Sequence, residues 1–203
     1  MYIENFRHRE CWIRLFISVD PAKQETMSVL HNLLAEERTY VLERLEDPVL
    51  HPLTLHPLFV PTLVIELLHS EILQLLDLLF ISSVRLYIAA DLHADDRYSH
   101  LRNRDLDVEQ ELERSLGYEQ RILILSEKMQ STIQIGRRLL GWFGAFETCH
   151  MTSELQSRFR SAGSIIENRL QYLVDTLDLQ MIRLKRTQGH TQLSRLGVSY
   201  YLC

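Results

Sequence analysis

The sequence predicts a mainly α-helical fold in which long antiparallel helices form a bundle or stalk, with at most one short N-terminal strand. Two observations lead to this prediction. Apolar residues recur at steps of three and four over long stretches, which is the period of an amphipathic helix. Glycine and proline are scarce, at 7 and 5 of 203 residues. Because four of the prolines lie within residues 47–61, few other breaks are expected.

The N-terminal part predicts a strand followed by a helix. Residues 11–19, CWIRLFISV, are dense in aromatic and β-branched residues, which is typical of a short strand. Asp20 and Pro21 suit a helix cap and a first helical residue, because proline has no N–H to leave unpaired there. This first helix is expected to reach Glu46. Its apolar stripe consists of Met27, Leu30, Leu34, Val41 and Leu45.

Residues 47–61, DPVLHPLTLHPLFVP, predict a stiff bend. Proline inside a helix costs about 3 kcal/mol and biases the preceding residue toward extended backbone, so the first helix cannot continue through this stretch. His51 and His56 lie within it, and two imidazoles are too few for a zinc site. We expect the prolines to set the angle between two helices and the histidines to line the bend.

Three long helices are predicted after the bend, at 58–91, 106–143 and 151–186. Gly141 or Gly144 is expected to end the second of these in the left-handed conformation. Short polar connections make consecutive helices antiparallel neighbours. The predicted organisation is a strand-like lead at 1–20, a helical bundle at 21–187 with the bend at 47–61, and an irregular tail at 188–203.

Composition limits the classes of function. The formal net charge of -5 argues against a nucleic-acid binder, which normally carries a basic face. The three cysteines have no short spacing, and they fit free thiols in a reducing compartment. A cytoplasmic location is therefore expected, with no nucleic-acid partner.

Residues 72–90 form the most apolar region and have nearly the length of a membrane span. Asp77 and Arg85 lie within this region, and each is costly at the middle of a bilayer. A helix buried on several sides of a bundle is therefore the preferred interpretation. A true membrane span at these residues is the alternative.

Few residues suggest chemistry. Asp91, His93, Asp95 and Asp96 are weak candidates for binding Mg²⁺ or another divalent cation. They lack the turn glycine and the closing glutamate of a calcium loop, so a solvated connection between helices is the alternative. The glutamates of residues 109–127 scatter around a helix and do not pair in a cleft. The sequence therefore predicts no enzymatic activity and no bound cofactor.

The last of the long helices has the clearest apolar pattern. Its apolar positions, with Ala162 among them, follow steps of four, three and seven, which is typical of a helix that packs along one face. About five heptads make a rod of roughly 50 Å. We expect self-association through this face. The residues are Leu155, Phe159, Ile166, Leu173, Leu177 and Leu184. The alternative is that the same residues are buried inside a monomeric four-helix bundle.

Three stretches carry a family resemblance: CWIRLFISVDP at 11–21, HPLFVPTLVIELLHSE at 56–71, and IIENRLQYLVDTLDLQMIRLKRTQGHTQLS at 165–194. Together they resemble fungal CorA-like proteins, which are relatives of the CorA/ZntB divalent-cation transporters. The first is similar to the last strand of the family's cytosolic domain. The second is similar to the start of its long helix, and the third to the stalk helix that precedes the membrane.

The resemblance implies a cytosolic helical domain that takes part in oligomerisation or in coupling to a membrane partner. In the family, two transmembrane helices and a short pore-mouth motif follow the stalk. Here residues 195–203, RLGVSYYLC, have no such pattern, so we do not expect this chain to conduct ions alone. A soluble helical-bundle interaction module without a transport role is the alternative function.

Overall fold

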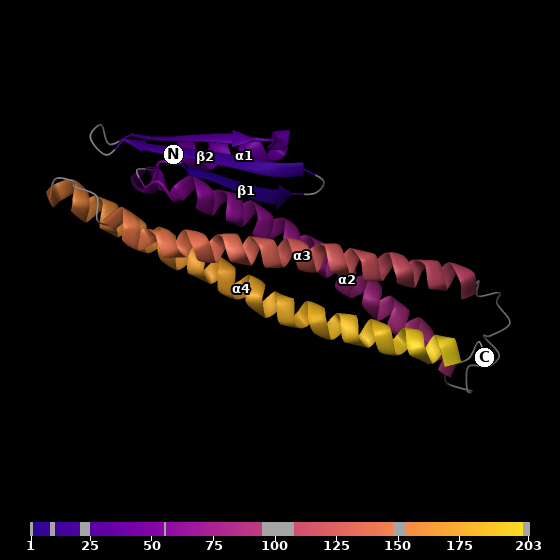
Figure 1. Cartoon of the computed structure of the whole chain (residues 1–203). Helices are drawn as coiled ribbons and strands as arrows, with labels where there is room; N and C mark the ends of the chain where they lie inside the picture. Colours follow the sequence, from indigo (N-terminus) through magenta and orange to yellow (C-terminus); the bar gives the residue numbers. More distant parts are fainter. Residues whose placement is uncertain are drawn as a thin grey trace. The chain divides into compact units, whose positions relative to one another are not determined.

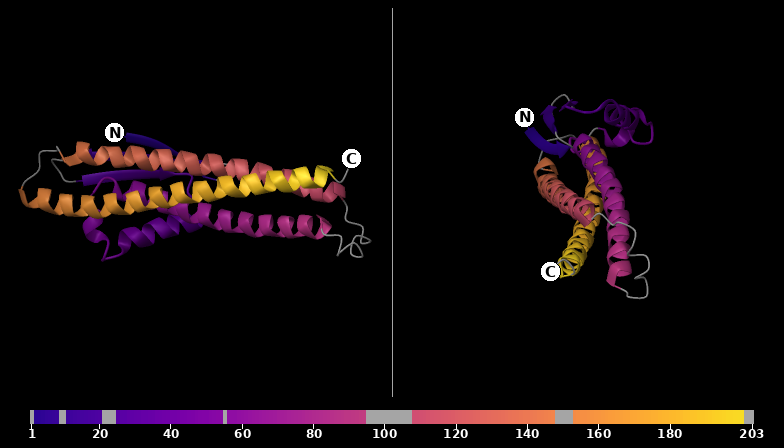
Figure 2. Two further views of the ribbon diagram at one scale, coloured as in Figure 1. Left: turned by 90° about the horizontal axis from the view of Figure 1, so that it is seen from below. Right: turned by 90° about the vertical axis from the view of Figure 1, so that its right-hand side faces the viewer.

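The computed structural model describes residues 2–8, 11–20, 25–54, 56–94, 108–147 and 153–200. Most of them are helical, as Figure 1 shows, which confirms the predicted mainly α fold. The helices are α1 (Ala35–Glu46), the short 3-10 helix η1 (His51–Leu53), α2 (Phe59–Ala94), α3 (Val108–Glu147) and α4 (Ser153–Tyr200). The last three are long, continuous helices in every view (Figure 2).

The N-terminus forms a three-stranded antiparallel sheet in the order β1-β2-β3. Its strands are β1 (Tyr2–His8), β2 (Cys11–Asp20) and β3 (Glu25–His31). The central strand is the one that the sequence predicts, but the expectation of at most one strand is wrong. An isolated strand would leave its backbone N–H and C=O groups unpaired, and β1 and β3 provide their partners.

The predicted helix at 21–46 is wrong in its first part, because residues 25–31 form β3 and the helix begins only at Ala35. Exposure alternates along β3, but the outward residues include Met27 and Val29, whereas Ser28 faces inward. The alternating apolar residues Met27 and Val29 therefore mark the exposed face and not the buried one, which is the reverse of the usual pattern of a half-buried strand. Asn32, with φ of 69°, then turns the chain toward α1 in the left-handed conformation that asparagine tolerates.

Two other predicted boundaries differ. α3 continues through Gly141 and Gly144 to Glu147, and no described glycine has a positive φ. α4 continues to Tyr200, so the tail predicted as irregular at 188–203 is helical for most of its length. The proline stretch behaves as expected, since α1 ends at Glu46 and Pro61 lies in the first turn of α2.

The chain divides into two compact units. Unit 1 consists of residues 1–71 and 128–178, and unit 2 consists of residues 72–127 and 179–203. The predicted domain bounds, with a helical bundle at 21–187, stay a prediction.

The core of unit 1 joins the sheet to helices from distant parts of the chain. Ile13, Leu15 and Ile17 of β2 are buried, and they belong to one apolar cluster with residues of α2, α3 and α4. α3 and α4 approach closely at Gly136, where an added Cβ would lie 2.5 Å from Cγ2 of Val174. Glycine is therefore required there by the space available, because a real Cβ would need the neighbour to move.

Unit 2 has a smaller described core. Ile72 and Leu79 of α2 are buried, and the Tyr118 hydroxyl of α3 donates a 2.7 Å hydrogen bond to the carbonyl oxygen of Leu79. On α2, by contrast, Leu78 and Phe80 are 63% and 62% exposed. The expected burial of this helix on several sides is thus wrong for residues 72–81. Among the helices that the structure describes, none combines the length and the apolar content needed to cross a membrane.

Candidate functional site

The predicted cation ligands are not brought together in the described part of the chain. Asp91 and His93 lie in the last turn of α2, but their side chains are outside the described part of the structure, and Asp95 and Asp96 lie outside the described residues. Within the described ranges no three His, Cys, Asp or Glu residues group as a metal site would require. Cation binding at residues 91–96 therefore stays a prediction.

The predicted association face of α4 is mostly interior. Ile166, Leu173, Leu177 and Leu184 are each at most 6% exposed within a single chain. Phe159 is half-buried, and the side chain of Leu155 is not in the part of the chain that the structure describes. The four buried residues therefore pack within their own chain, and self-association through this face stays a prediction.

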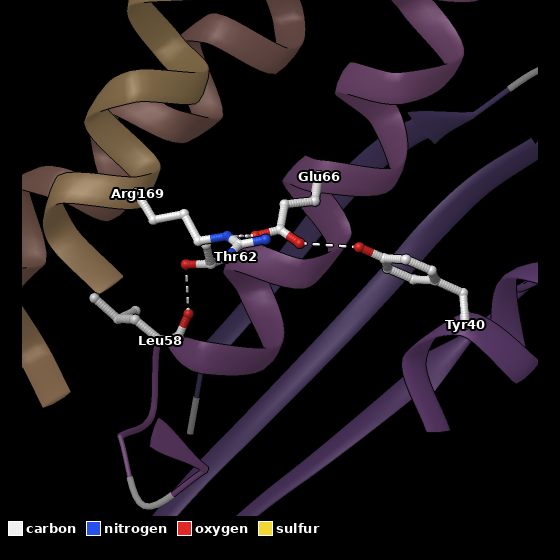
Figure 3. A network of polar contacts seen from close by, with 5 residues as sticks. All are labelled: Tyr40, Leu58, Thr62, Glu66 and Arg169. Atoms are coloured by element: carbon white, nitrogen blue, oxygen red, sulfur yellow. Dashed lines mark hydrogen bonds and ion pairs between the residues drawn. The ribbon is translucent and has the colours of Figure 1, made fainter. Parts of the chain in front are cut away.

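Glu66, in the second turn of α2, is the centre of a polar cluster in unit 1. Figure 3 shows Tyr40 of α1 and Arg169 of α4 approaching its carboxylate from opposite sides. The Tyr40 hydroxyl donates to one carboxylate oxygen at 3.0 Å, and the Nε–H of Arg169 donates to the other. The Glu66 side chain is only 7% exposed, so both partners offset the cost of removing its charge from water.

The surroundings of Tyr40 in this cluster raise the pKa of its hydroxyl. Burial raises the pKa of its phenol, and the nearby charge of Glu66 and the hydrogen bond to it raise the pKa further. Arg44 acts in the opposite direction, and its guanidinium lies 5.3 Å from the centre of the Tyr40 ring. The hydroxyl therefore stays protonated at neutral pH and serves as a donor that ties α1 to α2.

His56 is a buried imidazole in the bend before α2. Its ring stacks on Phe143 of α3 with centroids 5.3 Å apart, and Phe159 of α4 lies 4.5 Å away. The backbone N–H of Leu58 donates to its Nδ1 at 3.2 Å, which requires this nitrogen to be unprotonated. Burial lowers the pKa of His56 to about 4. The imidazole is therefore neutral near pH 7 and acts as an acceptor at the start of the helix.

The neighbouring Gly163 of α4 explains how His56 is accommodated. A Cβ at this glycine would lie 3.2 Å from Nε2 of His56, which is tighter than ordinary contact. His51, the other histidine of the bend, is exposed. The two imidazoles therefore differ in environment.

A second buried ion pair joins α2 to α3. Nζ of Lys128 lies 2.6 Å from a carboxylate oxygen of Glu71, and their side chains are 7% and 18% exposed. His69, three residues after Glu66 on α2, is partly buried. Burial lowers its pKa, and the charge of Glu66 opposes that effect. These polar groups add connections between helices that are otherwise held by apolar contacts.

The space beside Glu66 is too small for a substrate. A cavity of about 10 Å³ adjoins Glu66 and Arg169, and its other walls are mostly apolar residues of η1, α2 and α4. That volume holds about one water molecule. The cluster therefore holds α1, α2 and α4 together, and the cavity beside it has no room for a reacting molecule larger than water.

Sequence reasoning missed the Glu66–Arg169 pair, although a signal was present. Arg169 interrupts the apolar pattern of the last long helix, and Glu66 interrupts the apolar run TLVIELL. Two opposite charges, each on an apolar helical face, are candidates for pairing in a core. Comparison of the chain with protein-family models, curated proteins and solved structures finds no match.

Proposed function

We propose that the chain is a non-enzymatic helical assembly domain that resembles the cytosolic helical region of CorA-like divalent-cation transporters. It acts by self-association or by coupling to a membrane-protein partner. The observation that carries the proposal is the exposed apolar surface of unit 2.

Unit 2 exposes more large apolar side chains than it buries, counted over its described residues. The six buried ones are Ile72, Leu79, Tyr118, Ile122, Leu125 and Leu184. The eight exposed ones are Leu75, Leu78, Phe80, Ile81, Leu123, Ile124, Leu179 and Ile182. All three helices of the unit contribute to the exposed set.

Unit 1 has the opposite balance. It buries 22 described hydrophobic residues and exposes seven large ones. Single exposed apolar residues are normal on any protein, but an apolar surface that outweighs the core is typical of a face covered by another molecule. Fully burying one leucine, isoleucine or phenylalanine is worth about 1.5–3 kcal/mol. Eight that are roughly half-exposed therefore represent a substantial driving force for association.

The association face proposed for α4 differs from the one predicted from heptads. Leu179 and Ile182 are 63% and 51% exposed, whereas Leu184 is buried. The two exposed residues are three apart and lie on neighbouring positions of one helical face. We propose that this face, and not the buried heptad positions, contributes the α4 part of the contact.

The family resemblance supports the proposal through its three stretches. β2 lies in the first stretch, Glu66 in the second and Arg169 in the third. All three lie in unit 1, where β2 supplies core residues and the two charged residues form an ion pair. The residues that suggest the family therefore include those that hold this unit together. A cytoplasmic location, at or near a membrane, is part of the same proposal.

The experiment measures the mass of the full chain in solution. We expect an oligomer by light scattering, and we expect Leu179→Asp with Ile182→Asp to lower its mass, because each change places a charge in the apolar contact. Gln188→Asp is the matched control, since Gln188 is an exposed polar residue on the same helix. Loss of the oligomer in the control as well, or no loss in the double variant, would count against the proposal.

A second function rests on a different observation. Because Ile166, Leu173 and Leu177 are satisfied within one chain, the protein also fits a monomeric helical interaction module whose exposed face binds another protein. A single monomer peak over a wide concentration range would favour this alternative. In that case the double variant should leave the mass unchanged.

A further inference from the structure

β3 is an edge strand with little protection. It pairs with β2 on one side, and no described strand pairs with its other side. An open edge presents unpaired N–H and C=O groups, and natural proteins usually blunt such an edge with proline, lysine or inward-facing charges. The strand ETMSVLH has no proline and no lysine, and its ionisable residues, Glu25 and His31, are at its two ends.

Each face of β3 carries side chains in unfavourable surroundings within the single chain. On the outer face Met27 and Val29 are 63% and 48% exposed. On the inner face the hydroxyl oxygen of Ser28 is buried, and it has no hydrogen-bond partner among the described residues. A buried hydroxyl without a partner is costly, so the surroundings of Ser28 are missing a polar group.

We propose that β3 pairs antiparallel with β3 of a second copy of this chain, across a two-fold axis at Ser28. Such an axis is perpendicular to the sheet and keeps each residue on its own face. In an antiparallel pair, two directly opposed residues point to the same face of the sheet. The axis must therefore lie level with one residue of each strand, because an axis between two residues would oppose residues that point to different faces. Centring it on Ser28 is the register that pairs all seven residues of the strand.

This register satisfies the groups that the single chain leaves open. Ser28 faces Ser28 of the second copy, so each hydroxyl gains a polar neighbour on the inner face. Met27 faces Val29 on the outer face, and the same pair forms twice. Glu25 faces His31 at both ends, where a carboxylate accepts a hydrogen bond from an imidazole N–H. In this one register, polar residues face polar residues, apolar residues face apolar residues, and each carboxylate faces an imidazole.

The inference uses the sheet of unit 1 alone and does not depend on the exposed helices of unit 2. It adds a second kind of contact, backbone strand pairing, which joins two three-stranded sheets into one of six strands. This mode of recognition gains affinity from main-chain hydrogen bonds and specificity from the side chains on alternate positions.

A disulfide at the axis tests the register directly. The full chain, with its three native cysteines changed to serine, carries either Ser28→Cys or the matched control Thr26→Cys. Both positions lie on the inner face of β3. In the proposed register the two copies of residue 28 are directly opposed, whereas the two copies of residue 26 are about 14 Å apart along the strands. We expect a cross-linked dimer for Ser28→Cys only.

A charge on the outer face provides the second measurement. Val29→Lys should raise the dissociation constant of the dimer about tenfold in sedimentation, because it disrupts the two outer-face pairs. Ser18→Lys is the control, since Ser18 is exposed on β2, away from the open edge. Equal cross-linking of both cysteine variants, or a monomer at the highest attainable concentration, would overturn the inference. Cross-linking that survives Leu179→Asp with Ile182→Asp separates this contact from the one proposed for unit 2.

Discussion

Gly136→Ala tests the packing of α3 on α4 in unit 1. Alanine is normally preferred to glycine inside a helix by about 1 kcal/mol, so the substitution would stabilise an unobstructed site. Here the new Cβ would lie 2.5 Å from Cγ2 of Val174, whereas carbon atoms pack best at about 3.5–4.0 Å. Val174 is 2% exposed and its branched side chain has one preferred rotamer in a helix, so it cannot turn aside. Either the helices separate or the side chain strains.

Overpacking of this kind costs about 1–3 kcal/mol, and an overlap of about 1 Å belongs near the upper value. After subtracting the gain in helix propensity, we expect Gly136→Ala to lower the free energy of unfolding by about 2 kcal/mol. The assay is urea unfolding followed by circular dichroism, with the slope compared between variants.

Gly141→Ala is the matched control, because Gly141 lies on the same helix and nothing is within 4 Å of its added Cβ. It should stabilise by about 0.5–1 kcal/mol. In a Val174→Ala background, Gly136→Ala should also become stabilising, which makes the two sites strongly non-additive. If Gly136→Ala stabilised the wild-type background as Gly141→Ala does, the close approach of the two helices would be refuted.

Two further predictions concern the polar groups of unit 1. Because burial lowers the pKa of His56 from 6.5 to about 4, its contribution to stability is complete above pH 6.5 and is lost as the pH falls toward 4, by about 3 kcal/mol in total. Unfolding measured at pH 7.5 and pH 4.5 should therefore show a smaller difference for His56→Asn than for wild type, while His51→Asn keeps the full difference. Arg169→Met should lower the unfolding free energy by about 1–3 kcal/mol, less than for a fully buried pair because Arg169 is 46% exposed. Adding Glu66→Gln should recover part of that loss, and a double variant no more stable than Arg169→Met would contradict the proposed cause.

The parts of the fold that could be predicted from the sequence are those with local signals. The prolines of 47–61 end one helix and start the next, so the start of α2 is within a residue of its prediction. The cluster of aromatic and β-branched residues likewise identifies β2. In these segments the local residues alone favour the structure that forms, and the rest of the chain adds only packing.

The sheet partners and the polar cluster could not be found in this way. β3 places Met27 and Val29 outward and Ser28 inward, so its burial pattern depends on a neighbour that the local sequence does not reveal. Glu66 and Arg169 are separated by 103 residues, and no local period reports their contact.

The heptads of α4 indicate a buried face correctly. Leu173 and Leu177 lie on that face, and both are buried within the single chain. An apolar period has the same form whether the partner belongs to the same chain or to another. The choice between the two therefore needed the structure.

The division of unit 1 between two distant segments has a consequence for synthesis on the ribosome. Its first segment ends at residue 71, and its last segment is complete only at residue 178. At about 5–20 residues per second, the nascent chain waits about 5–20 s between these points. During that interval the apolar cluster that contains Ile13, Leu15 and Ile17 of β2 lacks the residues that α3 and α4 later contribute. The growing chain is then most exposed to aggregation and to capture by chaperones, and its long-range contacts favour slow folding.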